Sequence, residues 1–118
     1  APQDKTQFRY AVALADRNGE VSEHFGESPY FAIVDVDAST KHVLRQEMVA
    51  NSYAGLEKGK GIKVAQLLIT YKPDFVVCRE SLSGKGPGYA FAEAGTQAMQ
   101  TEARRLDDVL AQLKPAPS

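Results

Sequence analysis

The sequence predicts an α/β fold in which a mixed five-stranded sheet is covered by about three helices. Three strand-like segments lie before residue 50, and helix-like and strand-like segments alternate after residue 60. An antiparallel meander followed by right-handed crossover connections gives such a sheet. Because the first segment can pair with the second on one side and with a later buried segment on the other, we expect the strand order 3-2-1-4-5.

The three expected strands of the meander are residues 8–15, 30–37 and 42–49. The first two are rich in apolar side chains, as buried strands are. The third alternates well enough to be a strand, with Val43 expected to face inward. Asn18 and Gly19 tolerate positive φ and predict a turn after the first strand, and residues 38–41 predict a second turn.

The next helix and strand are strongly patterned. In residues 62–71 the apolar side chains recur at spacings of three and four, which predicts a helix that Pro73 ends. Residues 75–78 are entirely apolar, as expected of a central strand that is buried on both faces. This strand is the expected parallel neighbour of the first one.

The last elements are shorter. We expect a helix at residues 89–94 that Gly95 closes, because glycine adopts the left-handed conformation found after helices. A weak edge strand at 96–99 follows. The apolar spacing of residues 106–113 predicts a final amphipathic helix, with Thr101 as its N-cap.

Length and composition indicate one globular domain. The chain has 118 residues, of which 43% are hydrophobic and 25% charged, and its net charge is −1. We expect the domain at residues 8–114, between linker-like tails at 1–7 and 115–118. The balanced charge argues against nucleic acid as a partner. The single cysteine, Cys78, excludes an internal disulfide and fits a reducing compartment.

Metal-ligating side chains follow the strand ends at which open α/β sheets bind ligands. His24 lies in the loop after the first strand, and Cys78 ends the buried central strand. An imidazole and a thiolate could together hold an exogenous metal ion or cluster, but a closed structural site needs four ligands. The alternatives are a surface histidine beside a packed phenylalanine and a small buried apolar cysteine side chain.

Two glycine- and lysine-bearing segments precede helices. They are residues 57–63 and 83–88, and the second contains Gly84, Lys85 and Gly86. Free backbone N–H groups at helix starts attract anions, so these loops could hold an anionic cluster. The alternative is two ordinary helix starts with solvated lysines. Asp16 lacks a second inward carboxylate, and no spacing supports a catalytic set, so we do not expect an enzyme.

One set of residues resembles the dinitrogenase iron-molybdenum cofactor biosynthesis family, the group of NifX, NafY and the NifB C-terminal domain. The resemblance rests on Gly19-x-Val21-Ser22-x-His24-Phe25-Gly26, then Pro29-Tyr30-Phe31, Asp35 and Asp37. It implies a ribonuclease H-like, three-layer fold that binds or carries metal clusters without catalysis. It also makes His24, Phe25 and Gly26 the expected cofactor-binding residues.

A closer resemblance is to a variant of this domain that follows the membrane part of some cation diffusion facilitator transporters. Residues 51–61 and 79–89 carry it, and residues 82–89 are the distinguishing part. It implies a cytoplasmic regulatory or metal-sensing domain, tethered to the inner membrane through a transmembrane domain that precedes Ala1. Residues 51–54 lack the further histidine that several family members carry there.

The leading hypothesis is therefore a non-catalytic module that binds a metal ion or metal–sulfur cluster, as the cytoplasmic regulatory domain of a cation efflux transporter. A free-standing carrier in cofactor assembly and a structural dimerisation domain are the alternatives. A metal-dependent nuclease rests on fold analogy alone. A homodimer is compatible with the first two hypotheses. One imidazole and one thiolate suit zinc, iron, copper or cobalt, so the metal is not determined.

Overall fold

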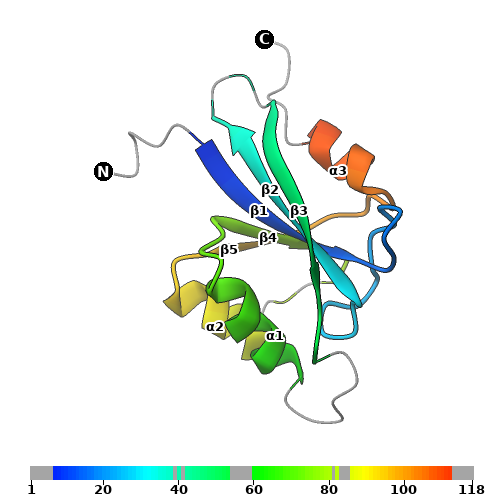
Figure 1. Ribbon diagram of the computed structural model, residues 1–118. Helices are drawn as coiled ribbons and strands as arrows, with labels where there is room; N and C mark the ends of the chain where they lie inside the picture. The colour runs from blue at the N-terminus through cyan, green and yellow to red at the C-terminus, as the bar shows by residue number, and fades with distance from the viewer. Residues whose placement is uncertain are drawn as a thin grey trace.

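The computed structural model describes residues 7–38, 40, 42–53, 60–80, 82 and 86–112 (Figure 1). The elements in chain order are β1 (Gln7–Leu14), β2 (Tyr30–Asp37), β3 (Val43–Ala50), α1 (Lys60–Ile69), β4 (Phe75–Cys78), α2 (Gly86–Glu93), β5 (Gln97–Gln100) and α3 (Leu106–Gln112). The five strands form one sheet in the order β3-β2-β1-β4-β5. The predicted α/β fold, its mixed sheet and its strand order are therefore confirmed.

The strand pairing explains why the centre of the sheet is so apolar. β1 pairs antiparallel with β2 and parallel with β4, and β4 pairs parallel with β5. Successive side chains of a strand point to opposite faces, so both faces of β1 and β2 need apolar residues. Helices α1 and α2 cover one face, and α3 covers the other (Figure 1).

Each face has its own core. On the α1 and α2 side, Phe25, Phe31 and Phe91 are the largest fully buried side chains. On the α3 side, Leu14 and Val109 are buried together with those side chains of β1 and β2 that point to this face. The three-layer arrangement places the loops at the carboxyl ends of β1, β4 and β5 at one end of the molecule.

The edge strand β3 departs from the prediction for Val43. Its side chain is 43% exposed rather than inward-facing. The register of β3 against β2 shifts beside it: Asp35 pairs with Arg45 and Val36 with Val43, which leaves Leu44 without a partner on β2. Because β3 has a strand on one side only and this bulge interrupts its pairing, alternation in the sequence did not place Val43 correctly.

The helix starts also differ from the prediction. α1 begins at Lys60, and α2 begins at Gly86 instead of residue 89. α3 begins at Leu106, so Thr101 is not its N-cap. The Thr101 side-chain oxygen instead accepts a hydrogen bond from the backbone N–H of Ala103 at 3.1 Å, within the loop that precedes the helix. Gly95 has the left-handed φ of 80° that was expected after α2.

Candidate functional site

Two loops from distant parts of the chain are joined at the carboxyl end of β1. The N–H of Val21 donates to the carbonyl of Arg104 at 2.8 Å, and the N–H of Leu106 donates to the carbonyl of Gly19 at 2.6 Å. Gly19 has φ 97°, a conformation that costs glycine little. These bonds fix the loop after β1 against the loop that precedes α3.

The turn at the start of this loop is held by Asp16. Its carboxylate oxygen Oδ1 accepts hydrogen bonds from the N–H groups of Asn18, at 2.8 Å, and Glu20, at 3.1 Å. A short acidic side chain often stabilises a turn in this way. Asp16 therefore has a structural role in the turn.

Residues 22–28, which we call the His24 loop, are anchored by Phe25. The Phe25 ring packs against Phe31 at 5.5 Å and Phe91 at 5.6 Å between centroids, and it is fully buried. The predicted cofactor-binding residue Phe25 is thus a core residue that fixes the loop. The exposed His24 and the buried Phe25 match the alternative of a surface histidine beside a packed phenylalanine, and cofactor binding by this loop stays a prediction.

Two serines flank His24 and hold its backbone. The hydroxyl of Ser22 donates to the His24 carbonyl at 2.9 Å and accepts from the His24 N–H at 3.2 Å. The hydroxyl of Ser28 donates to the same carbonyl at 2.5 Å. Ser28 is fully buried and Ser22 nearly so. The backbone of His24 is therefore fixed although its side chain is exposed.

Two side chains from other loops complete the anchoring of the His24 loop. The amide of Asn51 donates to the carbonyls of Ser28, at 2.7 Å, and Gly26, at 3.3 Å. The carboxylate of Glu80 accepts a hydrogen bond from the Phe25 N–H. Gly26, which was predicted to bind a cofactor, thus contributes a carbonyl to the anchoring of the loop.

The imidazole of His24 is the free metal-ligating group of this loop. Within the described part of the chain it has no hydrogen-bond or ion-pair partner. A histidine nitrogen can serve as a ligand to zinc, copper, iron or nickel. Because hydrogen bonds fix the backbone on either side of His24, a ligand bound to the imidazole would contact a loop of fixed conformation.

Cys78 lies at the same end of the sheet but inside the molecule. Its side chain is 1% exposed and belongs to the core beneath α1 and α2. The thiol donates to the carbonyl of Glu80 at 3.1 Å. Glu80 therefore contacts both the strand end of Cys78 and the His24 loop. A role for Cys78 as a metal ligand stays a prediction.

A pocket of about 330 Å³ opens beside the His24 loop, and we call it the edge pocket. Its lining residues are Ala15, Glu20, Val21, Glu23, Arg79 and Arg104. Arg79 donates through Nη1 to the carboxylate of Glu23 at 3.1 Å. Its Nε is buried and, among the described residues, has no hydrogen-bond partner. A buried N–H of a charged group without an acceptor is costly, so this position suits an added acceptor.

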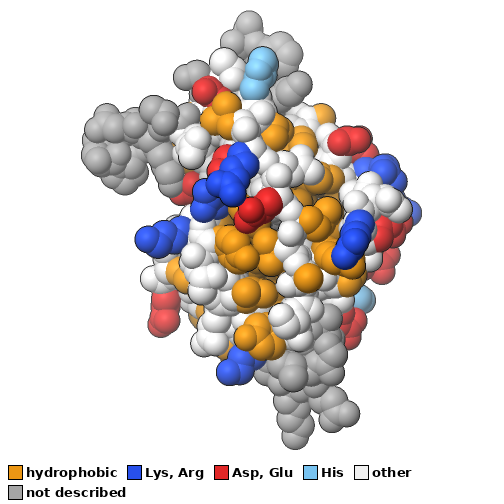
Figure 2. Space-filling model, in the orientation of Figure 1, with side chains coloured by type: hydrophobic (Ala, Val, Ile, Leu, Met, Phe, Trp, Pro, Cys, Tyr) orange, Lys and Arg blue, Asp and Glu red, His pale blue; other side chains and the backbone are white. Residues whose placement is uncertain are grey.

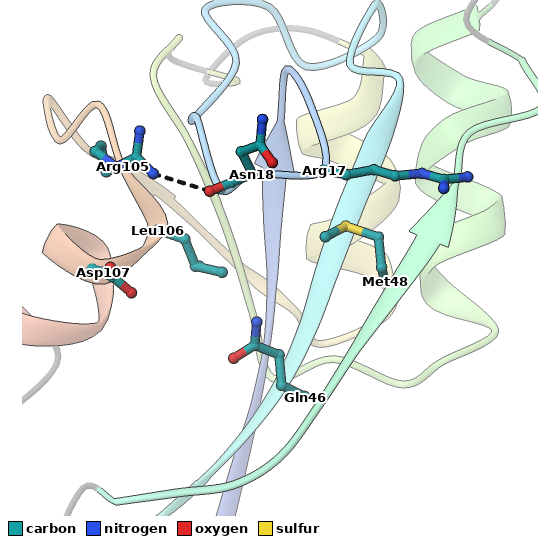
Figure 3. A pocket seen from close by; sticks show the side chains of 8 residues that line it. Arg17, Asn18, Gln46, Met48, Arg105, Leu106 and Asp107 are labelled. Atoms are coloured by element: carbon teal, nitrogen blue, oxygen red, sulfur yellow. Dashed lines mark hydrogen bonds between the residues drawn. The ribbon is translucent and has the colours of Figure 1, made fainter.

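A smaller pocket lies at the same end of the sheet, on the face that α3 covers (Figure 3). Gln46 and Met48 project into it from β3, and Arg17 and Arg105 approach from the two joined loops. Arg105 donates to the carbonyl of Asn18 at 3.0 Å. Arg17 lies over the Tyr30 ring at 5.2 Å and donates through Nε to its hydroxyl at 3.1 Å.

Together the two pockets bring four arginines to this end of the sheet. They are Arg17, Arg79, Arg104 and Arg105. They were not among the predicted site residues. Only Arg79 had a signal that could have identified it, because it directly follows the buried central strand. The others come together through loop pairings that no local pattern encodes.

The predicted anion loops lie partly outside the described residues. Gly84 and Lys85 are among the residues that are not described, whereas Gly86 begins α2. A Cβ added at Gly86 would lie 3.0 Å from the Ile62 side chain, and one at Gly61 would lie 2.8 Å from Cγ of Pro87. The two glycines thus let the starts of α1 and α2 approach closely. Anion binding there stays a prediction.

The described residues contain no group of three or more His, Cys, Asp or Glu side chains that could hold a metal ion. No helix in that part of the chain is long and apolar enough to cross a membrane. The donor set consists of one exposed imidazole with arginines nearby. It can ligate a metal centre that brings its own remaining ligands, and it can neutralise negative charge.

Comparison with known proteins agrees with this picture. Residues 8–115 match the family model described as dinitrogenase iron-molybdenum cofactor. The chain therefore belongs to this family, and the resemblance inferred from the His24 motif is confirmed. No curated protein matches the chain. The resemblance to the transporter-linked variant stays a prediction.

Solved structures share the fold. The apo form of the orange protein from Desulfovibrio gigas has 26% identity and a TM-score of 0.70, with 93% of this chain and 92% of that chain covered. The protein PH0822 has 24% identity and a TM-score of 0.71, with 87% and 86% covered. A putative NifB protein from Thermotoga has 23% identity and a TM-score of 0.64, with 88% and 84% covered.

Proposed function

We propose that this domain binds and carries an anionic metal–sulfur cluster of the iron–molybdenum type, with His24 as its protein ligand. The observation that carries the proposal is the exposed imidazole of His24, which has no partner among the residues that the structure describes, on a loop whose backbone is fixed by Ser22 and Ser28. Membership of a family described by the iron-molybdenum cofactor supports it. The cluster is the cargo of the domain.

The donor set favours a cluster over a bare metal ion. A structural zinc ion takes four ligands from the protein, and a catalytic one usually takes three. One imidazole is too few for a bare ion to be held tightly. A cluster already carries inorganic sulfide ligands, so a single histidine can complete its coordination and be exchanged when the cargo is released.

The edge pocket contains Glu20 and Glu23 beside its two arginines, so the argument for an anionic cargo rests on Arg79. Arg79 is held in place by Glu23, yet its buried Nε has no acceptor among the described residues. Hydrogen bonds between a guanidinium and an anion are about twice as strong as neutral ones. We propose that Arg79 and Arg104 neutralise the cargo while His24 ligates it.

The first test is a titration of the whole chain with tetrathiomolybdate, followed by ¹H–¹⁵N NMR and by the absorbance of the thiomolybdate. We expect saturable shifts in the His24 loop and in residues around Arg79. His24→Ala should weaken binding at least tenfold. His42→Ala is the matched control, because the other histidine is also exposed and precedes β3 at the far end of the sheet. Equal binding by both variants would overturn the role of His24.

The second test concerns charge. Arg79→Gln should weaken thiomolybdate binding and reduce its dependence on salt, because a charge pair with the ligand is lost. Lys72→Gln removes an exposed cation in the turn before β4, at the far end of that strand from Arg79, and should leave binding unchanged. If both variants bind like the unmodified chain, the edge pocket is not the anion site.

The finer hypotheses are proposals with their own tests. Cys78→Ala should leave binding intact if His24 is the only protein ligand. Thiomolybdate released from the protein should be chemically unchanged if the domain is not an enzyme. Regulation of a linked cation transporter, at the cytoplasmic side of the inner membrane, would require the reading frame to continue upstream of Ala1 through several apolar helices.

A further inference from the structure

Among the described residues, β3 is an edge strand of the sheet, and it carries exposed apolar side chains. β3 ends the strand order, and Val43, Leu44 and Met48 on it are 43%, 54% and 39% exposed. Figure 2 shows apolar and charged side chains interleaved on the face along which β3 runs. An edge strand of eight residues with exposed apolar side chains is a template for pairing with another strand.

The register on β2 shows which backbone groups of β3 point outward. The N–H of Asn51 donates to the carbonyl of Pro29 at 2.9 Å, next to the pair of Tyr30 with Ala50. Hydrogen-bonded and non-hydrogen-bonded positions alternate along an antiparallel pair. Glu47 therefore directs its N–H and carbonyl toward β2, whereas Gln46 and Met48 direct theirs toward the open edge.

The charges of β3 are self-complementary about Gln46. If two copies of β3 pair antiparallel with Gln46 opposite Gln46, then Arg45 of each copy lies opposite Glu47 of the other. The two Gln46 residues exchange both outward hydrogen bonds. Arg45 and Glu47 then occupy non-hydrogen-bonded positions, where opposite side chains lie closer together.

The neighbouring registers are worse. A shift of one residue places Gln46 opposite a residue whose backbone N–H and carbonyl are bonded to its own β2. The outward N–H and carbonyl of Gln46 then have no partner. A shift of two residues places Arg45 opposite Arg45, or Glu47 opposite Glu47, and like charges directly opposite are destabilising. Within β3, the register centred on Gln46 is the one that matches both hydrogen bonds and charges.

We infer that a second copy of this chain pairs with β3 to form a two-fold symmetric dimer centred on Gln46, with a continuous sheet across both copies. Met48 of each copy then lies opposite the bulged Leu44 of the other, so exposed apolar side chains close both ends of the contact. The inference is independent of cluster binding. A contact through one strand is at the small end of interface sizes, so the dimer is concentration-dependent.

The mass of the whole chain by sedimentation equilibrium, from about 10 μM to about 1 mM, tests the dimer. We expect a rise toward twice the monomer mass, weakened by salt. Slower amide exchange at Gln46 and Met48 should accompany it. A monomer throughout this range would overturn the inference.

Charge exchange tests the register. Arg45→Glu alone and Glu47→Arg alone each place like charges opposite one another, so each variant should weaken self-association at least tenfold. An equal mixture of the two variants has opposite charges at every such pair and should form a heterodimer. The intrachain pair of Arg45 with Glu47 at 3.3 Å is exposed, so its loss should cost little stability. Failure of the mixture to associate would overturn the register.

Gln46→Pro tests the backbone bonds separately. The N–H that proline removes points to the open edge, and proline is tolerated at such positions in edge strands. We expect a folded monomer. A folded Gln46→Pro variant that still dimerises would overturn the inference.

Discussion

The carboxylate of Glu80 accepts a hydrogen bond from the backbone N–H of Phe25, a residue 55 positions earlier in the chain. This bond joins the loop after the interior strand β4 to the His24 loop. Because Phe25 directly follows His24, the position of the imidazole depends on Glu80 as well as on the two serines. Glu80 also accepts, through its carbonyl, the thiol hydrogen of Cys78.

Glu80→Ala should destabilise the His24 loop. A buried N–H that loses its acceptor costs roughly 1–3 kcal/mol. We expect a lower free energy of unfolding in urea and broader NMR signals for residues 23–26. Glu23→Ala is the control, since Glu23 is exposed and its pairing with Arg79 is of the surface type. A loop that stays ordered in Glu80→Ala would show that the serines and Asn51 suffice to hold it.

Gly88→Ala should destabilise the domain because its Cβ would lie 2.2 Å from the backbone carbonyl oxygen of Leu82. That oxygen cannot move like the end of a flexible side chain, so we expect a cost of roughly 1–3 kcal/mol. Gly95→Ala meets no atom within 4 Å but keeps a φ of 80°, so it should cost about 1 kcal/mol. Thermal unfolding measures both variants. Equal losses would argue against the close approach at Gly88.

The decrease in the free energy of unfolding at alkaline pH should depend on Tyr10. Burial, together with the nearby charge of Asp74, raises the pKa of Tyr10 above its ordinary value of 10.0. As pH rises, the Tyr10 hydroxyl therefore loses its proton at a lower pH in the unfolded chain than in the folded one. The contribution of Tyr10 to the free energy of unfolding is fully present below pH 10 and is lost as pH rises through the pKa of the folded state. Urea unfolding at about pH 8 and at about pH 11 should show a smaller alkaline loss in Tyr10→Phe. Tyr89→Phe, at an exposed tyrosine, should match the unmodified chain.

Asp35→Asn should cost far more than the equivalent change at an exposed pair. Arg9 donates to both carboxylate oxygens of Asp35, at 2.7 and 3.1 Å, and this hydrogen bonding raises the pKa of Arg9. The Asp35 side chain is 7% exposed. We expect a loss of roughly 1–3 kcal/mol in the free energy of unfolding.

Glu47→Gln is the matched comparison for Asp35→Asn. Its partner Arg45 is 68% exposed and lies 3.3 Å away, so the loss should be at most about 1 kcal/mol. Urea unfolding of both variants at neutral pH gives the difference directly. Equal losses would mean that burial of Asp35 adds nothing to its pairing with Arg9.

Much of the fold could be predicted because its signals are local. The apolar runs of β4 and β2 lie within single segments, and the predicted bounds 75–78 and 30–37 agree with the structure. A short apolar run indicates a strand that is buried on both faces, and β4 is such an interior strand, between β1 and β5. The His24 motif was likewise contiguous, so the family could be identified from it.

The sequence by itself determined the strand order, the family and the place of His24 in the loop after β1. Only the tertiary structure decided that Phe25 and Cys78 are buried, that Val43 is exposed, and that Arg79 and Glu80 lie beside the His24 loop. The physical reason is the range of the interactions. Periodicity reports neighbours three or four residues apart, whereas the contacts of Phe25 with Glu80 and of Glu23 with Arg79 join residues more than 50 positions apart and exist only once the sheet has assembled.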